Sequence, residues 1–361
     1  MISDFNSYTA ELRENIKKRG DMTIVMGNEA ADLDSMASAV SYAWFLRLNE
    51  PGINAVPLIN IPRADFKLRT EAVFLFNEAK VDIDSLIFTD DLDLEQIQTE
   101  GRLNLILIDH NKLAAEQSNL FDSVSEILDH HADEKNYPVS IKKDIRSVGS
   151  AATLVAERFL ASSPDAVDLQ LGSLLLGTIL LDTVNLDPAA ERVTDADSAA
   201  AAELITRTGR NQNELFNKLQ FEKFNVSSLE SYDLLRKDYK EWIMNTTKCG
   251  IASVLLSVDE WLKKDHALPE AFGRYLKERK LDVLLAMSAY TNPDFNRNLV
   301  VYVPDDANQK IVINFLEEAD LGLELIETEY PASDKLVFYS QGNLGISRKK
   351  LQPLLNQLFT G

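Results

Sequence analysis

Short apolar runs alternate with helical patterns through the N-terminal half of the chain, and this alternation constrains the fold more than any other feature. The segment 103–108 (LNLILI) is the clearest buried strand, and the runs 23–26, 55–59 and 125–128 have the same apolar character. The segment 35–48, between the first two of these strands, is rich in small and apolar residues, as expected of a helix. Strands that alternate with helices are typical of a mostly parallel sheet covered by helices. The sequence therefore predicts an α/β domain.

The C-terminal part of the chain shows a similar alternation and predicts a smaller α/β domain. Strands are expected at 251–258, 282–288, 299–303 and 335–339. An alanine-rich helix predicted over 195–207 is followed by Thr-Gly-Arg-Asn, a composition typical of a break between elements. We place the domain boundary at this break, which predicts two domains, 1–208 and 209–361.

Net charge and cysteine content narrow the possible partners and the compartment. The 361 residues carry a formal net charge of −20, which repels nucleic acid because nucleic-acid binding normally depends on a basic surface. No apolar run approaches the roughly 18 residues of a membrane span. Residues 1–20 have the pattern of an amphipathic helix and lack the apolar core of a secretory signal. The single cysteine, Cys249, fits a reducing compartment, so we expect a cytoplasmic protein without a nucleic-acid or membrane partner.

Histidines and aspartates gather directly after two of the predicted strands. Asp109 and His110 follow the LNLILI strand, and Asp129, His130 and His131 follow the SEIL strand. Polar residues at the carboxyl ends of parallel strands meet at one edge of the sheet, where open α/β sheets bind ligands. Either motif alone is equally typical of a solvated turn, but two of them on neighbouring strands favour a functional site.

Three further acidic residues adjoin apolar helices. Asp32 and Asp34 lie at the start of the predicted helix 35–48. Helix capping explains one of them and leaves the other without a role. Two close carboxylates repel each other unless a cation lies between them. Asp182 ends the apolar segment 173–181, where a carboxylate is costly to bury without a partner. A helix end in contact with solvent is the alternative interpretation of Asp182.

Together these positions predict a metal site. The expected ligands are Asp32, Asp34, Asp109, His130 and Asp182. Carboxylate oxygens with one imidazole suit Mg²⁺ or Mn²⁺, and a shared carboxylate would hold two ions about 3.5–4 Å apart, as in two-metal phosphoryl-transfer sites. Residue types alone do not exclude a Ser-His-Asp triad, but the chain has no Gly-x-Ser-x-Gly elbow. It also has no Gly-x-x-x-x-Gly-Lys-Ser/Thr loop for ATP.

These stretches, in this order, resemble the four motifs of the DHH phosphoesterase superfamily, which is named after its Asp-His-His run. Two C-terminal stretches extend the resemblance: 234–240 (LLRKDYK) is similar to the Asp-x-Lys motif, and 345–350 (GISRKK) to the Ser-Arg-Lys motif, of the associated DHHA2 domain. That domain is shared by family II inorganic pyrophosphatases, eukaryotic cytosolic exopolyphosphatases and prune proteins. The resemblance covers the chain from about Thr23 to Leu358 and implies an active site in a cleft between the two domains.

Asn28 distinguishes the branches of this group. Family II pyrophosphatases carry histidine at this position, whereas exopolyphosphatases and prune proteins carry asparagine in the same Gly-Asn-Glu context as this chain. The segment 57–69 also resembles the exopolyphosphatase and prune branch. An amide is a poorer ligand than imidazole for a transition metal, so one metal site is expected to be weaker or to favour Mg²⁺ over Mn²⁺.

The resemblance also implies a role for each motif. The five ligands would hold two divalent ions, Mg²⁺ or Mn²⁺, with Asp109 bridging them, and Asp129 would orient a neighbouring histidine. The implied catalytic group is Asp109, Asp129, His130 and His131. The residues expected to contact the substrate are Asn28, His110, His131, Ser150, Lys240, Arg348 and Lys349. For Ser150, at the start of a predicted helix, simple capping is the stronger interpretation.

The predicted function is that of an exopolyphosphatase, which removes the terminal phosphate of inorganic polyphosphate. A prune-like enzyme for short polyphosphates or nucleotide phosphoesters is the first alternative; a manganese-dependent pyrophosphatase is the second and is disfavoured by Asn28. A non-catalytic interaction protein is disfavoured because every expected metal ligand is present. A DHH-type exonuclease is disfavoured because the chain has no Gly-Gly pair and a net charge of −20. The preferred chain length, the physiological metal and the oligomeric state stay open.

Overall fold

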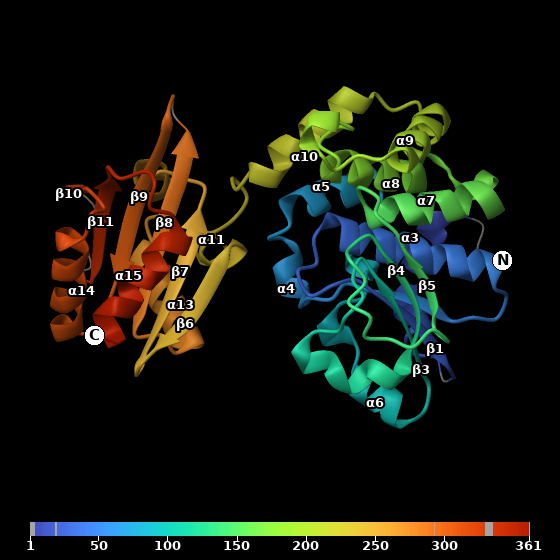
Figure 1. The fold of residues 1–361 in the computed structure, drawn as a ribbon, viewed down its shortest axis with the longest axis horizontal. Coiled ribbons are helices and arrows are strands. Elements are labelled where there is room, and N and C mark those ends of the chain that lie inside the picture. The colour runs from blue at the N-terminus through green and yellow to red at the C-terminus, as the bar shows by residue number, and fades with distance from the viewer. Residues whose placement is uncertain (1–3, 19, 292, 329–334, 361) are drawn as a thin grey trace. The chain divides into compact units, whose positions relative to one another are not determined.

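The computed structural model describes residues 4–18, 20–291, 293–328 and 335–360. The chain forms two compact units, Met1–Asn225 and Val226–Gly361, which run from blue to yellow-green and from yellow to red in Figure 1. Each unit has its own sheet. These units are defined by their compactness alone, so they do not test the functions predicted for the domains 1–208 and 209–361. Those domain assignments stay predictions.

The first unit is built on a five-stranded sheet with the order β2-β1-β3-β4-β5, in which every pair is parallel. The strands are β1 (Met22–Met26), β2 (Ala55–Leu58), β3 (Leu103–Ile108), β4 (Val124–Asp129) and β5 (Lys142–Ile145). The predicted mostly parallel sheet is confirmed. The sequence does not predict β5, because its residues KKDI are charged, as is common for a strand at the edge of a sheet.

Helices cover both faces of this sheet. The α-helices of the first unit are α1 (Phe5–Ala10), α2 (Leu12–Asn15), α3 (Leu33–Asn49), α4 (Arg63–Phe66), α5 (Thr70–Glu78), α6 (Leu94–Thr99), α7 (Ala151–Ser162), α8 (Leu169–Asp182), α9 (Asp195–Thr208) and α10 (Gln212–Phe224). Helices α3 and α7 pack against each other and against the sheet, whereas α6 packs against β3. Figure 1 shows α6 on the opposite side of the sheet from α3. Strand β1 is buried along its whole length, as expected for a strand covered on both faces.

Most of the predicted helices of this unit are present. The predicted segments 35–48, 173–181 and 195–207 lie in α3, α8 and α9. The described part of residues 1–20 forms the two short helices α1 and α2 instead of one amphipathic helix. The 3-10 segment Ala115–Ser123 is nine residues long. Single 3-10 turns connect other elements at Ile83–Ser85, Thr89–Asp91, Pro164–Ala166 and Pro188–Ala190.

The second unit has a six-stranded mixed sheet with the order β10-β11-β9-β8-β7-β6, in which only β7 and β8 pair in parallel among the described strands. The strands are β6 (Tyr239–Met244), β7 (Thr247–Val254), β8 (Val283–Thr291), β9 (Phe295–Tyr302), β10 (Leu323–Leu325) and β11 (Leu336–Gln341). The sequence does not predict the outer strands β6 and β10. The predicted strand 251–258 is wrong at its end, because Ser257 and Glu260 form a capping box that starts a helix at Val258.

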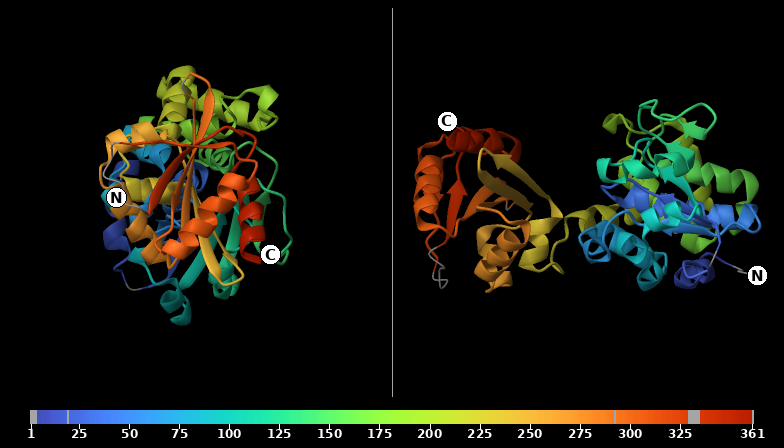
Figure 2. Two further views of the ribbon diagram at one scale, coloured as in Figure 1. Left: turned by 90° about the vertical axis from the view of Figure 1, so that its left-hand side faces the viewer. Right: turned by 90° about the horizontal axis from the view of Figure 1, so that it is seen from below.

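Alternating side chains of this sheet form two cores. Leu285 packs in a core with residues of α14 (Asp306–Glu318) and α15 (Arg348–Thr360), while its neighbours in β8 point to the other face. The other face carries α11 (Ser231–Lys237), α12 (Val258–Lys264) and α13 (Leu268–Arg279). Figure 2 shows α14 and α15 side by side on their face of the sheet. Among the described residues of both units, no helix has the length and apolar composition to cross a membrane.

Candidate metal centre

The predicted polar motifs lie together because the strands that precede them are neighbours. Met26 of β1 pairs with Leu107 of β3, and Ile108 of β3 pairs with Leu128 of β4. The residues that follow these strands therefore meet at the carboxyl edge of the sheet. Asp109 turns the chain there with a left-handed backbone, φ 63°, while its N–H donates to the Leu128 carbonyl at 2.9 Å. Such a conformation is uncommon for a residue with a Cβ and favours a functional constraint at this position.

The Asp109 carboxylate is held by groups from other segments. Its Oδ2 accepts hydrogen bonds from Ser35 Oγ at 2.6 Å and from Asn28 Nδ2 at 2.8 Å. Its Oδ1 lies 3.1 Å from His130 Nε2. Burial, followed by the charge of Asp34, raises the pKa of Asp109 to about 7. An ionised Asp109 therefore needs a cation nearby.

Asp34, in the first turn of α3, directs its carboxylate at the N-terminus of helix α7. Its carboxylate accepts the N–H groups of Ala151 at 2.6 Å and Ala152 at 2.9 Å, and the hydroxyl of Ser38 at 2.9 Å. A helix N-terminus favours an anion, but burial is the larger effect and raises the pKa of Asp34. Because Asp34 takes these amides and Ser150 is fully buried, the structure does not favour Ser150 as a phosphate ligand.

His130 presents its Nε2 to these two carboxylates. Its Nδ1 lies 3.0 Å from the Val148 carbonyl oxygen, which can only accept, so Nδ1 carries a proton. The Nε2 atom lies 3.1 Å from Asp109 Oδ1 and 3.7 Å from Asp34 Oδ2. Burial lowers the pKa of His130, but the contacts with Asp109 and Asp34 outweigh it and raise the pKa to about 10. The site thus attracts positive charge to the position that Nε2 faces.

Asp182 and Asp32 complete the group of acids. Asp182 is the last residue of α8, and its buried Oδ2 has no partner at hydrogen-bond distance among the described residues. The Ser150 side chain interacts with the Asp182 carboxylate, but this effect is smaller than that of burial. Burial, followed by the charges of Asp34 and Asp32, raises the pKa of Asp182 well above its usual value. Asp32 is exposed and caps α3 by accepting the N–H of Ser35 at 3.0 Å. A buried carboxylate oxygen without a protein partner is expected where a cation binds.

All five predicted ligands line one cavity of about 430 Å³ in the first unit. Ligand atoms of Asp109, His130 and His131 lie within 4.8 Å of one another, close enough to share an ion. Oxygen donors with an imidazole nitrogen suit Mg²⁺ or Mn²⁺, and crowded acids with raised pKa values are stabilised by such an ion. The residues of the cavity therefore fit a divalent metal ion.

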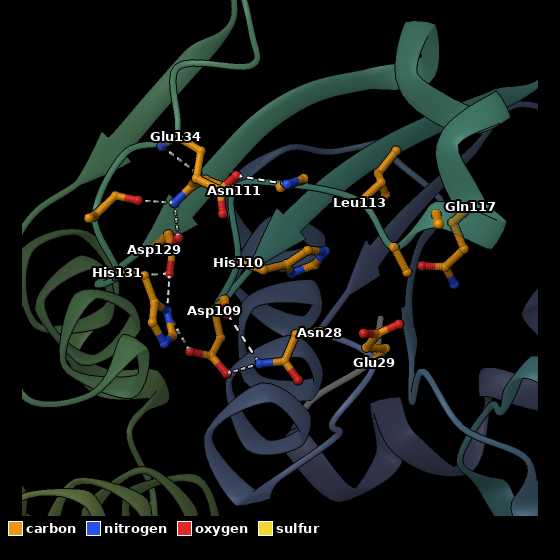
Figure 3. Close-up of a pocket in the computed structure, with 14 residues that line it drawn as sticks. Asn28, Glu29, Asp109, His110, Asn111, Leu113, Gln117, Asp129, His131 and Glu134 are labelled. Carbon is orange, nitrogen blue, oxygen red and sulfur yellow. Dashed lines mark hydrogen bonds and ion pairs between the residues drawn. The ribbon is translucent and has the colours of Figure 1, made fainter. Parts of the chain in front are cut away.

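Asp129 holds His131 in one orientation, as Figure 3 shows. Its Oδ1 accepts hydrogen bonds from His131 Nδ1 at 2.9 Å and from the backbone N–H of His130 at 2.8 Å. Its Oδ2 accepts from Asn111 Nδ2 at 2.5 Å. Burial opposes the ionisation of Asp129, but these hydrogen bonds outweigh it and lower the pKa of Asp129. The exposed His131 ring thus has its Nε2 left for a ligand.

Asn111, which was not among the predicted site residues, is buried and contacts Asp129. Besides its bond to Asp129, the Asn111 side chain donates to the Ala132 carbonyl at 3.0 Å and accepts the Glu134 N–H at 2.9 Å. Asn111 therefore fixes both Asp129 and the chain that follows the Asp-His-His run. Its place directly after Asp109 and His110 was the available signal.

A second cavity, of about 460 Å³, adjoins the metal centre and shares Asn28, Asp109 and His131 with it. His110 lines this cavity, as Figure 3 shows. Its Nδ1 lies 3.0 Å from the Ile108 carbonyl oxygen, and its buried Nε2 has no partner among the described residues. Burial lowers the pKa of His110, so the neutral ring offers Nε2 as an acceptor. An acceptor does not favour the direct contact with phosphate oxygens predicted for His110.

The two predicted basic motifs are neighbours within the second unit. Arg348, at the start of α15, donates to the Asp238 carbonyl oxygen at 2.8 Å and to the Asp238 carboxylate at 2.7 Å. Lys240 follows in β6, and both Lys240 and Lys349 are exposed. The predicted contacts of these residues with a substrate, and the predicted cleft between the domains, stay predictions.

Comparisons with known proteins match most of both units. The DHH family, N-terminal domain, matches residues 22–179, and the DHHA2 domain matches residues 217–358. Exopolyphosphatase PRUNE1 of Rattus norvegicus is 33% identical over 355 residues, which cover 97% of this chain and 78% of that protein. Exopolyphosphatase PRUNE1 of Homo sapiens is 34% identical over 358 residues, with the same 97% and 78% coverage. Manganese-dependent inorganic pyrophosphatase of Methanocaldococcus jannaschii is 27% identical over 298 residues, which cover 78% of this chain and 87% of that protein.

Proposed function

This chain belongs to the DHH family with a DHHA2 domain, in the prune branch, and on that premise we propose that it is a metal-dependent exopolyphosphatase. It would hydrolyse the terminal phosphoanhydride bond of inorganic polyphosphate and release phosphate. The observation that carries this proposal is the convergence of five metal-ligand side chains on one cavity at the carboxyl edge of the sheet. A cytoplasmic location and a small phosphoanhydride substrate, with no nucleic-acid or membrane partner, belong to the same proposal.

Two divalent ions, Mg²⁺ or Mn²⁺, are the proposed cofactors. Their ligands are Asp32, Asp34, Asp109, His130 and Asp182. Asp109 is the proposed bridging ligand; its Oδ1 lies 3.1 Å from His130 Nε2, which itself lies 3.7 Å from Asp34 Oδ2. When bound, such ions lower the pKa of an attacking water and stabilise negative charge on the phosphoryl oxygens.

Asn28 supports the exopolyphosphatase branch over a pyrophosphatase. Its Oδ1 accepts the N–H groups of Ala30 at 2.9 Å and Ala31 at 3.1 Å, and its Nδ2 donates to Asp109 Oδ2 at 2.8 Å. The amide oxygen is therefore already engaged by the backbone, and the amide nitrogen has no lone pair to offer a metal. Asn28 would position Asp109 instead of binding an ion, which weakens one metal site and favours Mg²⁺.

The remaining residues would bind and orient the substrate. His131, held by Asp129, would direct its Nε2 at the phosphoryl oxygens of the terminal phosphate. The basic residues Lys240, Arg348 and Lys349 would bind the inner phosphates of the polyphosphate substrate. Arg348 suits this role because arginine bonds two phosphate oxygens at once. Asp129 stays ionised in this role because its hydrogen bonds lower its pKa.

The test is phosphate release from a panel of substrates and metals. Tripolyphosphate and long-chain polyphosphate should release phosphate with Mg²⁺ or Mn²⁺, and EDTA should abolish the release. Activity confined to tripolyphosphate or to nucleotide phosphoesters would favour the prune-like alternative, and rapid cleavage of pyrophosphate would favour a pyrophosphatase. If no compound of the panel is cleaved with Mg²⁺, Mn²⁺ or Co²⁺, the proposed function is wrong.

A further inference from the structure

The charged side chains that line the metal cavity are mostly acidic, and an acidic cavity repels a phosphate. Besides the four aspartates among the ligands, the cavity is lined by Glu191, and a phosphate substrate adds more negative charge. Bound cations offset part of this charge, but the phosphate oxygens also need hydrogen-bond donors of fixed direction. Among the described residues that line the cavity, Arg192 is the one lysine or arginine.

Arg192 lies in the loop that connects two helices of the metal centre. The loop follows Asp182, the last residue of α8, and ends at Thr194, the N-cap of α9. One end of the loop therefore starts at a predicted metal ligand. This connection places Arg192 on the same unit as the metal site, so its contact with a ligand does not depend on the second unit.

The loop is held in a conformation that few sequences adopt. Val184, Asn185 and Leu186 have left-handed backbones, with φ values of 52°, 62° and 61°, and Glu191 has φ 54°. Hydrogen bonds from the Leu186 N–H to Thr183 Oγ1 at 3.1 Å and from the Asn185 N–H to the Leu180 carbonyl at 2.7 Å hold the first turn. Consecutive left-handed residues persist where the surrounding structure holds them, which is typical of functional sites.

Asp197 fastens the far end of this loop to the metal centre. Its fully buried carboxylate accepts the Thr194 N–H at 2.7 Å, the Gly149 N–H at 2.8 Å and the Thr153 hydroxyl at 2.5 Å. A Cβ added at Gly149 would lie 2.7 Å from the Arg192 carbonyl oxygen, so only glycine allows this close approach. The segment that Asp197 holds includes Val148, whose carbonyl orients His130. The backbone of Arg192 thus packs against the segment that orients the predicted metal ligand His130.

The Arg192 side chain is exposed and makes no ion pair with any carboxylate in the described part of the chain. The nearby Arg207 differs, because its Nε donates to Glu203 at 2.8 Å on the surface of α9. An arginine held at the rim of an acidic cavity without a protein counter-ion is available for an anionic ligand. Its planar guanidinium can bond two phosphate oxygens at once.

We propose that Arg192 is a substrate-binding residue that bonds the terminal phosphoryl group from the same unit as the metal ligands. This inference rests on the proposed function and extends it by naming a phosphate contact that lies outside the basic motifs of the second unit.

Steady-state kinetics on tripolyphosphate with Mg²⁺ test the inference. Arg192→Gln should lower kcat/KM about 10- to 100-fold, because it removes charged hydrogen bonds to the phosphate. Arg192→Lys should show a smaller loss of kcat/KM than Arg192→Gln, because lysine keeps the positive charge but lacks the planar guanidinium that bonds two oxygens. The matched control is Arg207→Gln, an exposed arginine on the adjoining helix, which should keep the wild-type kcat/KM.

Two binding measurements separate this inference from the proposed function. Isothermal titration of Mn²⁺ should give the same affinity for Arg192→Gln and wild type, and a weaker Mn²⁺ affinity would overturn the inference in favour of a structural role. Titration of imidodiphosphate with Mg²⁺ should show weaker binding to Arg192→Gln, and unchanged binding would also overturn it. If wild type hydrolyses nothing while imidodiphosphate binding still depends on Arg192, the proposed function fails and the inference stands. If wild type neither binds imidodiphosphate nor hydrolyses tripolyphosphate, both fail.

Discussion

The predicted site residues of the two units lie in opposite environments. The first unit buries Asp34, Asp109 and Asp182 close together, and the pKa of each is raised because burial and mutual repulsion oppose ionisation. The second unit leaves Lys240 and Lys349 exposed to solvent. Keeping these acids close together therefore lowers the free energy of unfolding when they are ionised. The exposed lysines are solvated and have little effect on it.

This difference indicates how each unit contributes to function. Buried charges of like sign are poorly screened, so they make a site that depends on cations, whereas exposed charges are screened by water and salt. Arg348 also forms an ion pair with Asp238, so a phosphate that binds Arg348 would compete with this carboxylate. We infer that the first unit decides whether the reaction occurs and that the second unit adjusts how strongly the substrate binds.

The largest expected effect comes from the centre of the acidic group. Asp109→Asn removes the charge of the proposed bridging ligand, and kcat for tripolyphosphate should fall about 1,000-fold or more. Phosphate release measures the loss, and circular dichroism checks that the fold is kept. The matched control, Asp122→Asn, changes an exposed acid on the same unit and should leave kcat unchanged. A normal kcat in Asp109→Asn would contradict the metal-site assignment.

A smaller loss is expected from the buried support of His131. Asn111→Ala removes the donor to Asp129 Oδ2, so Asp129 should hold His131 less firmly, and kcat should fall about tenfold. Mn²⁺ affinity, measured by titration, should change little because Asn111 contacts no predicted ligand. Asn119→Ala, which changes an exposed asparagine in the 3-10 segment Ala115–Ser123, serves as the control. Equal kinetics for the two variants would remove Asn111 from the mechanism.

The basic motifs of the second unit should give a weaker effect that depends on salt. Arg348→Gln should raise KM for long-chain polyphosphate about three- to tenfold at low ionic strength, and the difference should shrink as salt is added. Kinetics at low and high salt measure this dependence. Arg279→Gln, which breaks an ion pair between Arg279 of α13 and Glu241 of β6, is the control. A large fall in kcat without a change in KM would contradict the division of roles between the units.

The smallest expected effect is on thermal stability. The folded-state pKa is raised to about 7 for Asp109 and to about 10 for His130, so the folded protein binds protons more tightly than the unfolded chain. This stabilisation is complete below the unfolded pKa values and is lost as pH rises through the folded ones. The Tm of the metal-free protein should therefore fall by a few degrees between about pH 5 and about pH 9.

Mn²⁺ sharpens this test because it replaces the protons. With saturating Mn²⁺ the fall in Tm should be smaller, since metal binding requires the deprotonated ligands and strengthens as pH rises. Scanning calorimetry in EDTA and in Mn²⁺ measures both curves. Hydrogen exchange should locate the protection by Mn²⁺ in residues 1–225. A Tm that is independent of pH without metal would show that the acids are not buried together.

Much of the first unit was readable from local patterns. Apolar runs predict four of its five strands because a parallel sheet buries both faces of a strand, and the charged edge strand β5 escapes that rule. The order of Asp32, Asp34, Asp109, His130 and Asp182 after these elements predicts a shared site, and the structure places all five on one cavity. In the second unit the same reasoning missed β6, since its alternating polar residues match an exposed outer strand.

The sequence by itself determined the α/β class and the family and predicted the acidic ligand set, because residue type and spacing carry that information along the chain. Only the tertiary structure decided which atoms face one another. It turned the Asn28 amide toward Asp109, directed the α7 amides to Asp34, and left the Asp182 Oδ2 without a partner at hydrogen-bond distance among the described residues. It also brought Arg192 to the cavity through Asp197. Such contacts join segments far apart in the chain, so no local pattern encodes them.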